Sequence, residues 1–157
     1  MRKTALIAGA TGATAKRLVE VLLADPDWSV VGVSRNPPAS AERLTYIAAD
    51  LLDPALSRHA LAECSGVTHV FYTARAKFGE GGVESVEDNA AMLRNVLDTI
   101  EPVARGLVHV HLVEGGKYYG QHLGPYPTPT HEDDPRHMPP NFYYDQQDLL
   151  VERQRGK

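Results

Sequence analysis

The stretch from Thr4 to Leu23, TALIAGATGATAKRLVEVLL, constrains the fold more than any other part of the chain. An apolar run meets a turn that holds Gly9 and Gly12, and from Ala13 onward the apolar residues recur at helical spacing. A strand, a glycine turn and a helix in this order are typical of the start of a dinucleotide-binding unit. Gly9 would permit the tight turn, and Gly12 would let the backbone approach a pyrophosphate that faces the first N–H groups of the helix.

The spacing of this motif is Gly-x-x-Gly-x-x-Ala, with Ala15 where a third glycine often lies. Alanine is small enough for close packing of the helix on the strand. We therefore expect Gly9, Thr11, Gly12 and Ala13 to contact the cofactor. The alternative is a flexible turn that contains two glycines by chance, which the apolar strand directly before it disfavours.

Length and composition indicate one domain, residues 1–157, of the dinucleotide-binding type. The net charge of −4 and the pI near 5.9 argue against nucleic acid as a partner. No apolar stretch approaches the ~20 residues of a membrane span, so no membrane partner is expected. The single cysteine, Cys64, cannot form an internal disulfide, which predicts a passive thiol and a cytoplasmic location.

Apolar strand patterns alternate with helical patterns along the whole chain. This alternation predicts right-handed crossovers and an α/β fold, a Rossmann-like doubly wound parallel sheet in the order 3-2-1-4-5. After the first strand and helix, we expect strands at 29–34, 45–49, 67–72 and 107–113 and helices at 54–63, 86–104 and 141–155.

The residues after the second strand indicate which dinucleotide is bound. A carboxylate there would accept hydrogen bonds from the ribose of NAD, whereas a basic residue would pair with the 2′-phosphate of NADP. The chain has Ser34 and Arg35 at this place and no carboxylate, so we predict NADPH, with both residues as contacts. The alternative is that Arg35 is a solvated loop arginine.

Two further pairs of residues follow later strands. Asp50 and Leu51 close the third strand and would lie beside the adenine. Thr73 and Ala74 open a polar, glycine-bearing loop, 73–82, after the fourth strand. Ligands of open α/β sheets bind at the carboxyl ends of the strands, so we expect all four residues to contact the cofactor.

The final helix presents a tyrosine pair without the lysine that usually accompanies a catalytic tyrosine. A short-chain reductase needs a phenol at the substrate oxygen and an ammonium nearby, because free tyrosine has a pKa near ~10. Most such enzymes take that lysine from Tyr-x-x-x-Lys. Here Gln147 stands four residues after Tyr143, and Asp148 stands four after Tyr144.

Six segments in and before this region share a family pattern: GATGATA at 9–15, GVSR at 32–35, THVFY at 68–72, NAAMLRNVLD at 89–98, GGKYYG at 115–120 and EDDPRHMPPNFYYDQQD at 132–148. Together with the missing lysine, they resemble the progesterone 5β-reductase and iridoid synthase family of atypical short-chain dehydrogenases/reductases, in the N-terminal portion of a bacterial member. The resemblance implies Tyr143 and the upstream Lys117 as the catalytic pair, and Arg35 as the contact to the 2′-phosphate. It implies transfer of a hydride from NADPH to the β-carbon of a small-molecule enone, whose oxygen Tyr143 would bind in the positive field of Lys117.

Members of that family continue well past the position of Lys157. The resemblance therefore implies a Rossmann domain truncated before its C-terminal strands and substrate region, with little turnover by itself. A homodimer is left open. The alternative functions are a carbonyl reductase, a sugar-nucleotide epimerase or dehydratase, and a non-catalytic NADP-binding protein.

Two histidine-bearing segments could attract a metal ion, although we predict no metal site. His109 and His111 alternate on the expected fifth strand and so share a face, where hydrogen-bonded core residues are the favoured interpretation. The segment 131–137 contains histidines and carboxylates, and a solvated acidic loop is the favoured interpretation there.

Overall fold

The computed structural model describes residues 2–155. Its centre is a parallel sheet in the order β3-β2-β1-β4-β5, as predicted from the alternation of strands and helices. Strand bounds agree with the predicted ones to within two residues: β1 (Lys3–Ala8), β2 (Trp28–Ser34), β3 (Leu44–Ala48), β4 (His69–Tyr72) and β5 (His109–Leu112).

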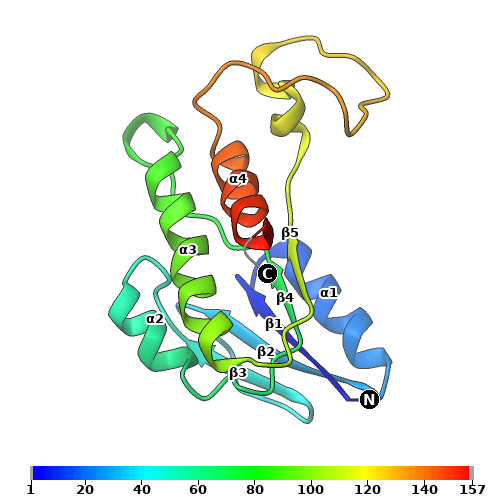
Figure 1. The fold of residues 1–157 in the computed structure, drawn as a ribbon, viewed down its shortest axis with the longest axis vertical. Coiled ribbons are helices and arrows are strands. Elements are labelled where there is room, and N and C mark those ends of the chain that lie inside the picture. The colour runs from blue at the N-terminus through cyan, green and yellow to red at the C-terminus, as the bar shows by residue number, and fades with distance from the viewer. Residues whose placement is uncertain (1, 156–157) are drawn as a thin grey trace.

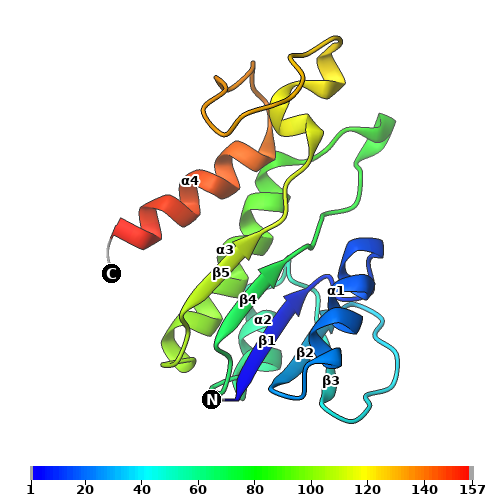
Figure 2. The same cartoon turned by 90° about the vertical axis from the view of Figure 1, so that its right-hand side faces the viewer.

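Helices cover both faces of this sheet (Figures 1 and 2). Side chains alternate across a strand, so β1 contributes to two cores. Ala5 and Ile7 belong to the core under α1, whereas Leu6 and Ala8 belong to the larger core with α2 and α3. The helices are α1 (Ala13–Ala24), α2 (Pro54–Leu61), α3 (Val86–Val103) and α4 (Phe142–Arg155).

The last helix, α4, packs on α3 rather than on the sheet alone. The guanidinium of Arg153 donates to Glu101 at 3.0 Å and pairs with Asp98 of α3. The buried Gln146 side chain donates to the Asn89 carbonyl at 2.8 Å. These contacts align α4 along α3 and hold the start of α4, and with it Tyr143, beside the start of α3.

The long segment between β5 and α4 lies beyond the carboxyl ends of the strands (Figure 2). It contains two short 3-10 helices, η2 (Gly116–Tyr119) and η3 (Gln121–Leu123). The loop after β4 contains another, η1 (Glu80–Gly82). Both loops follow the carboxyl ends of strands and so lie at the edge where an open α/β sheet binds its ligand.

Within the described residues, none of the helices combines the length and the apolar character needed to cross a bilayer.

Candidate active site

The glycine turn after β1 is shaped by contact with the loop after β4. Gly9 has φ +82°, and a Cβ at this position would lie 2.8 Å from the Cα of Ala74. Only glycine tolerates both the positive φ and this contact. Helix α1 then begins at Ala13, and its N-cap residue, Gly12, has no side chain to cap the first N–H groups. Its N-terminus is therefore available to an anion.

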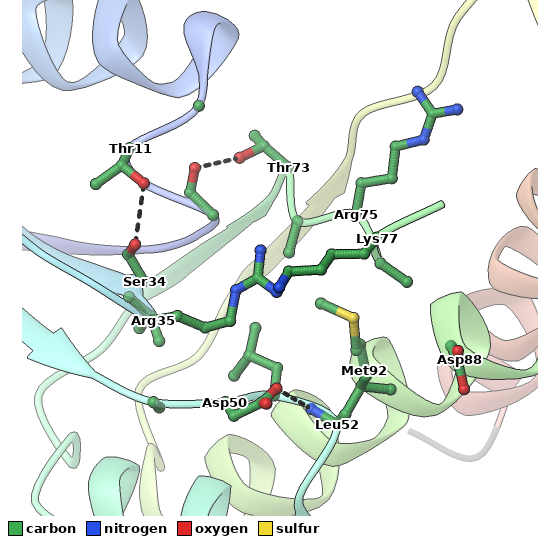
Figure 3. A pocket seen from close by; sticks show the side chains of 17 residues that line it. Thr11, Ser34, Arg35, Asp50, Leu52, Thr73, Arg75, Lys77, Asp88 and Met92 are labelled. Carbon is green, nitrogen blue, oxygen red and sulfur yellow. Dashed lines mark hydrogen bonds between the residues drawn. The ribbon is translucent and has the colours of Figure 1, made fainter. Parts of the chain in front are cut away.

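A cleft of about 470 Å³ lies at the carboxyl ends of the strands, in front of this turn (Figure 3). Ala13, the first residue of α1, was expected to contact the cofactor and does not line the cleft within the described part of the chain. The predicted cofactor residues that do line it are Gly9, Thr11, Gly12, Ser34, Arg35, Asp50, Leu51, Thr73 and Ala74.

Short hydrogen bonds tie the walls of the cleft together. The hydroxyls of Thr11 and Ser34 lie 2.9 Å apart, which joins the glycine turn to the end of β2. The Thr73 hydroxyl donates to the Ala8 carbonyl at 2.7 Å, which joins β4 to β1. Arg35 points into the cleft from the end of β2 (Figure 3). A glycine cradle, an uncapped helix and a cation in place of a carboxylate fit a phosphorylated dinucleotide.

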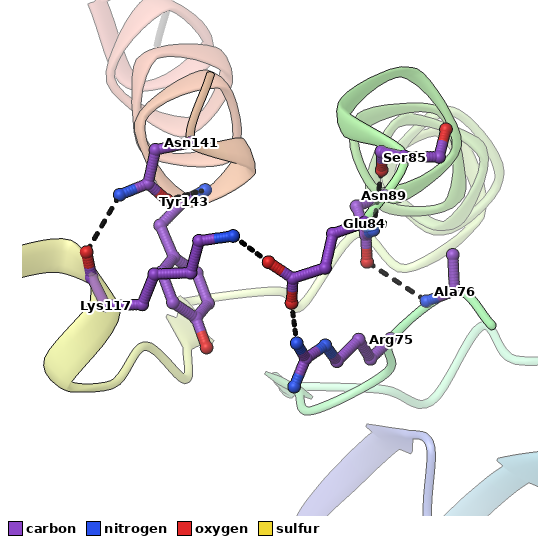
Figure 4. A network of polar contacts seen from close by, with 8 residues as sticks. All are labelled: Arg75, Ala76, Glu84, Ser85, Asn89, Lys117, Asn141 and Tyr143. Atoms are coloured by element: carbon purple, nitrogen blue, oxygen red, sulfur yellow. Dashed lines mark hydrogen bonds and ion pairs between the residues drawn. The ribbon is translucent and has the colours of Figure 1, made fainter. Parts of the chain in front are cut away.

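The two predicted catalytic residues come from segments that meet at the edge of the sheet beside this cleft (Figure 4). Lys117 lies in η2, and Tyr143 lies in the first turn of α4. The buried Asn141 side chain donates to the Lys117 carbonyl at 3.0 Å and so fastens one segment to the other. The Tyr143 hydroxyl lies beside Gly115, where a Cβ would be 3.6 Å from that oxygen.

Glu84, which the sequence interpretation did not single out, connects Lys117 with the cofactor cleft. Its carboxylate forms ion pairs with the Lys117 ammonium and with Arg75, a residue that lines the cleft (Figure 4). The Glu84 side chain is only 10% exposed. Arg75 belongs to the same loop as Glu84, whereas Lys117 lies in the segment after β5, so no local spacing in the sequence could indicate the contact with Lys117.

The residue in the usual lysine position is engaged elsewhere. Gln147 accepts a hydrogen bond from the Tyr118 hydroxyl at 2.9 Å and another from Arg136. Asp148 accepts two hydrogen bonds from the same guanidinium, at 2.7 and 2.8 Å, which holds the pKa of its carboxyl below the usual value. Both residues therefore fasten the long loop to α4 instead of supplying a charge to Tyr143.

The second tyrosine of the pair, Tyr144, packs inside the structure. Tyr144 is buried, and its hydroxyl donates to the Tyr118 carbonyl at 2.6 Å. The same oxygen accepts a hydrogen bond from the His137 backbone N–H at 2.8 Å. Tyr144 thus has a structural role in holding the long loop.

Glu114 lies shortly after β5 and was not predicted as a site residue from the sequence. Burial raises the pKa of its carboxyl to about 7, against a smaller lowering by the charge of Arg136. Its Oε1 atom is buried without a hydrogen-bond partner among the described residues. A carboxyl in this state is neutral at mildly acidic pH and ionises near neutrality.

The prediction that the β5 histidines are core residues is wrong. His109 and His111 are exposed. In residues 2–155 β5 is the edge strand of the sheet, which leaves these side chains exposed. The ring centroid of His109 lies 6.1 Å from that of His69, and the centroid of His111 lies 5.9 Å from that of Phe71. In residues 2–155, potential metal ligands do not gather in groups of three or more.

Comparison with known proteins agrees with this architecture. The NAD dependent epimerase/dehydratase family matches residues 5–155. The chain belongs to this family. Its fold is shared with UDP-glucose 4-epimerase from Bifidobacterium longum, solved with NAD+ and UDP, at a TM-score of 0.77 and 21% identity over 99% of this chain and 50% of that one.

Two curated relatives in this family confirm the resemblance to progesterone 5β-reductase and iridoid synthase. The chain is 40% identical to 3-oxo-Delta(4,5)-steroid 5-beta-reductase of Arabidopsis thaliana, over 94% of this chain and 41% of that protein. It is 35% identical to (S)-8-oxocitronellyl enol synthase of Catharanthus roseus, over 96% of this chain and 41% of that protein. The chain thus spans less than half the length of these relatives.

Proposed function

We propose that the chain forms the cofactor-binding and oxygen-binding part of an NADPH-dependent reductase of α,β-unsaturated carbonyl compounds. Gly9, Gly12 and the start of α1 would hold the pyrophosphate, and Arg35 would hold the 2′-phosphate. Bound NADPH supplies a hydride. The preference for NADPH over NADH is supported by the cation at the end of β2, where a carboxylate would favour NADH.

Tyr143 would bind the carbonyl oxygen of the enone. Negative charge develops on that oxygen when the β-carbon accepts a hydride, and a phenol that donates a hydrogen bond stabilises it. Lys117 would add a positive charge on the same side of the sheet, and Glu84 would hold the Lys117 side chain in place. The chain's own contribution is therefore to orient the substrate oxygen and to stabilise its charge.

The observation that supports this proposal most is that the usual lysine position holds Gln147, a neutral residue. A carbonyl reductase or epimerase of the usual type has a lysine there, which lowers the pKa of the tyrosine from one helical turn away. Gln147 is neutral and bonded to Tyr118 and Arg136. Tyr143 would therefore receive its positive charge from Lys117 of another segment, which is the arrangement that the resemblance to progesterone 5β-reductase and iridoid synthase implies.

The test is Tyr143→Phe in the complete gene product, assayed by loss of NADPH absorbance with a small α,β-unsaturated ketone. We expect kcat to fall about a hundredfold or more, because one donor to a developing oxyanion contributes on that order. Tyr126→Phe, in the long loop, is the matched control and should keep the rate. An unchanged rate in Tyr143→Phe would remove this residue from the mechanism.

A further inference from the structure

Charge is distributed unevenly over the walls of the cofactor cleft. Three cations line it, Arg35, Arg75 and Lys77, and the lining carboxylates are Asp50 and Asp88. Arg75 is directed away from the cleft and pairs with Glu84 (Figures 3 and 4). Asp50 accepts a hydrogen bond from the Leu52 N–H at 3.1 Å and so turns toward its own loop.

The two remaining cations point toward one another from opposite walls (Figure 3). Arg35 follows β2, whereas Lys77 belongs to the loop after β4. Within residues 2–155, neither side chain forms a hydrogen bond or ion pair. Like charges that face each other repel, so this arrangement is favourable only when an anion lies between them.

We propose that Lys77 is the second cationic contact for the 2′-phosphate of NADPH, opposite Arg35. This inference rests on the proposed function and adds a residue that selects between the two dinucleotides. A phosphate monoester carries a charge between −1 and −2 near neutral pH and accepts charge-assisted hydrogen bonds from more than one donor, here a planar guanidinium and a compact ammonium. The residue after Arg35 is the neutral Asn36, so the β2 end supplies one cation and the β4 loop supplies the other.

The direction of Lys77 distinguishes the 2′-phosphate from the pyrophosphate. The pyrophosphate is expected at the glycine turn, where the start of α1 supplies N–H groups. Lys77 points toward Arg35 and not toward Thr11 of that turn (Figure 3). A contact with the 2′-phosphate affects NADPH alone, whereas a contact with the pyrophosphate affects NADH and NADPH equally.

The test measures binding and needs no turnover. NADPH and NADH are titrated by calorimetry into the 157-residue chain and its Lys77→Met variant, which keeps the length of the side chain and removes the charge. We expect the Kd for NADPH to rise about tenfold, the loss of one charge-assisted contact, and the Kd for NADH to change by less than about twofold. Lys77→Arg should keep most of the affinity for NADPH.

Arg105→Met is the matched control, because Arg105 is exposed in the turn between α3 and β5, at the opposite end of the sheet. It changes the net charge equally and should leave both affinities unchanged. Equal losses for NADPH and NADH in Lys77→Met, or no loss at all, would overturn the inference and leave the cofactor proposal standing. If the unaltered chain binds neither dinucleotide, the cofactor proposal fails as well.

Discussion

At the scale of single residues, the Glu84 carboxylate joins two loops that are far apart in the chain. It holds Arg75 of the cofactor cleft and Lys117 of the proposed catalytic pair, and little of it is exposed to solvent. Partly buried ion pairs cost desolvation energy, so their main effect is seen when one partner is removed. Glu84 is therefore expected to fix the geometry of the site more than to stabilise the fold.

The first prediction concerns Glu84→Gln. The change leaves two cations facing a neutral amide, and we expect the free energy of unfolding to fall by about 1–3 kcal/mol. Urea denaturation followed by circular dichroism measures this. Glu80→Gln removes an exposed carboxylate from the same loop and should lie within about 0.5 kcal/mol of the unaltered chain. Equal stabilities of the two variants would show that the Glu84 contacts contribute nothing to the free energy of unfolding.

The second prediction follows from Glu114. Its pKa is about 7 in the folded chain against an ordinary value of 4.5, so the folded state binds more protons than the unfolded state between these pH values. Stability therefore falls as pH rises through this window, and the loss is complete above pH 7. Glu114→Gln removes the ionisation. When the pH is raised from about 5 to about 8, the free energy of unfolding of the variant should rise by about 2 kcal/mol relative to that of the unaltered chain.

Urea denaturation at both pH values provides the measurement, with the exposed Glu132→Gln as the control. A stability difference between Glu114→Gln and the unaltered chain that stays constant with pH would show that Glu114 titrates normally.

Site residues could be predicted where chemistry follows a strand directly, and not where it depends on a distant partner. Arg35 and Thr73 come just after strands, so the sheet edge places them in the cleft. The contact of Glu84 with Lys117 and the approach of Lys77 to Arg35 each join two different loops, which no local pattern indicates. The exposure of His109 depends on the place of β5 at the edge of the sheet in residues 2–155, which no local pattern indicates.

At the scale of elements, helices α1 and α3, which both begin beside the cleft, differ in their N-terminal caps. Helix α3 is capped by Ser85, whose hydroxyl accepts the Asp88 N–H at 3.0 Å. The N-cap residue of α1 is Gly12, which makes no such hydrogen bond, although a side-chain cap is worth about 1 kcal/mol. An uncapped start beside the glycine turn leaves N–H groups for the phosphates of a dinucleotide.

The third prediction tests that use of α1 with the pair Gly12→Asn and Gly12→Asp. Gly12 has φ −70°, which other residues adopt, and both side chains can cap the helix. Both variants face the same tight contact, because a Cβ at this position lies 3.2 Å from the Gly9 carbonyl oxygen. Only aspartate adds a negative charge where the pyrophosphate is proposed to bind. We expect NADPH to bind Gly12→Asp at least about tenfold more weakly than Gly12→Asn in the calorimetric titration. Equal affinities would place the pyrophosphate elsewhere.

At the scale of the whole molecule, the sheet order could be predicted because strands alternate with helices and the glycine motif after β1 is typical of a doubly wound parallel sheet. The long segment between β5 and α4 does not follow in the same way. Its course is set by single contacts, such as Asn141 with Lys117 and Arg136 with Asp148, and not by a repeated apolar pattern. That segment also determines where Lys117 lies relative to Tyr143.

The most direct test of the proposed function is to identify the product of one reaction. The complete gene product is incubated with NADPH and a small α,β-unsaturated ketone, and the product is identified by mass spectrometry and NMR. Reduction of the C=C bond to give the saturated ketone is the predicted result. Reduction of the C=O bond to give the allylic alcohol, with the C=C bond intact, would contradict the account.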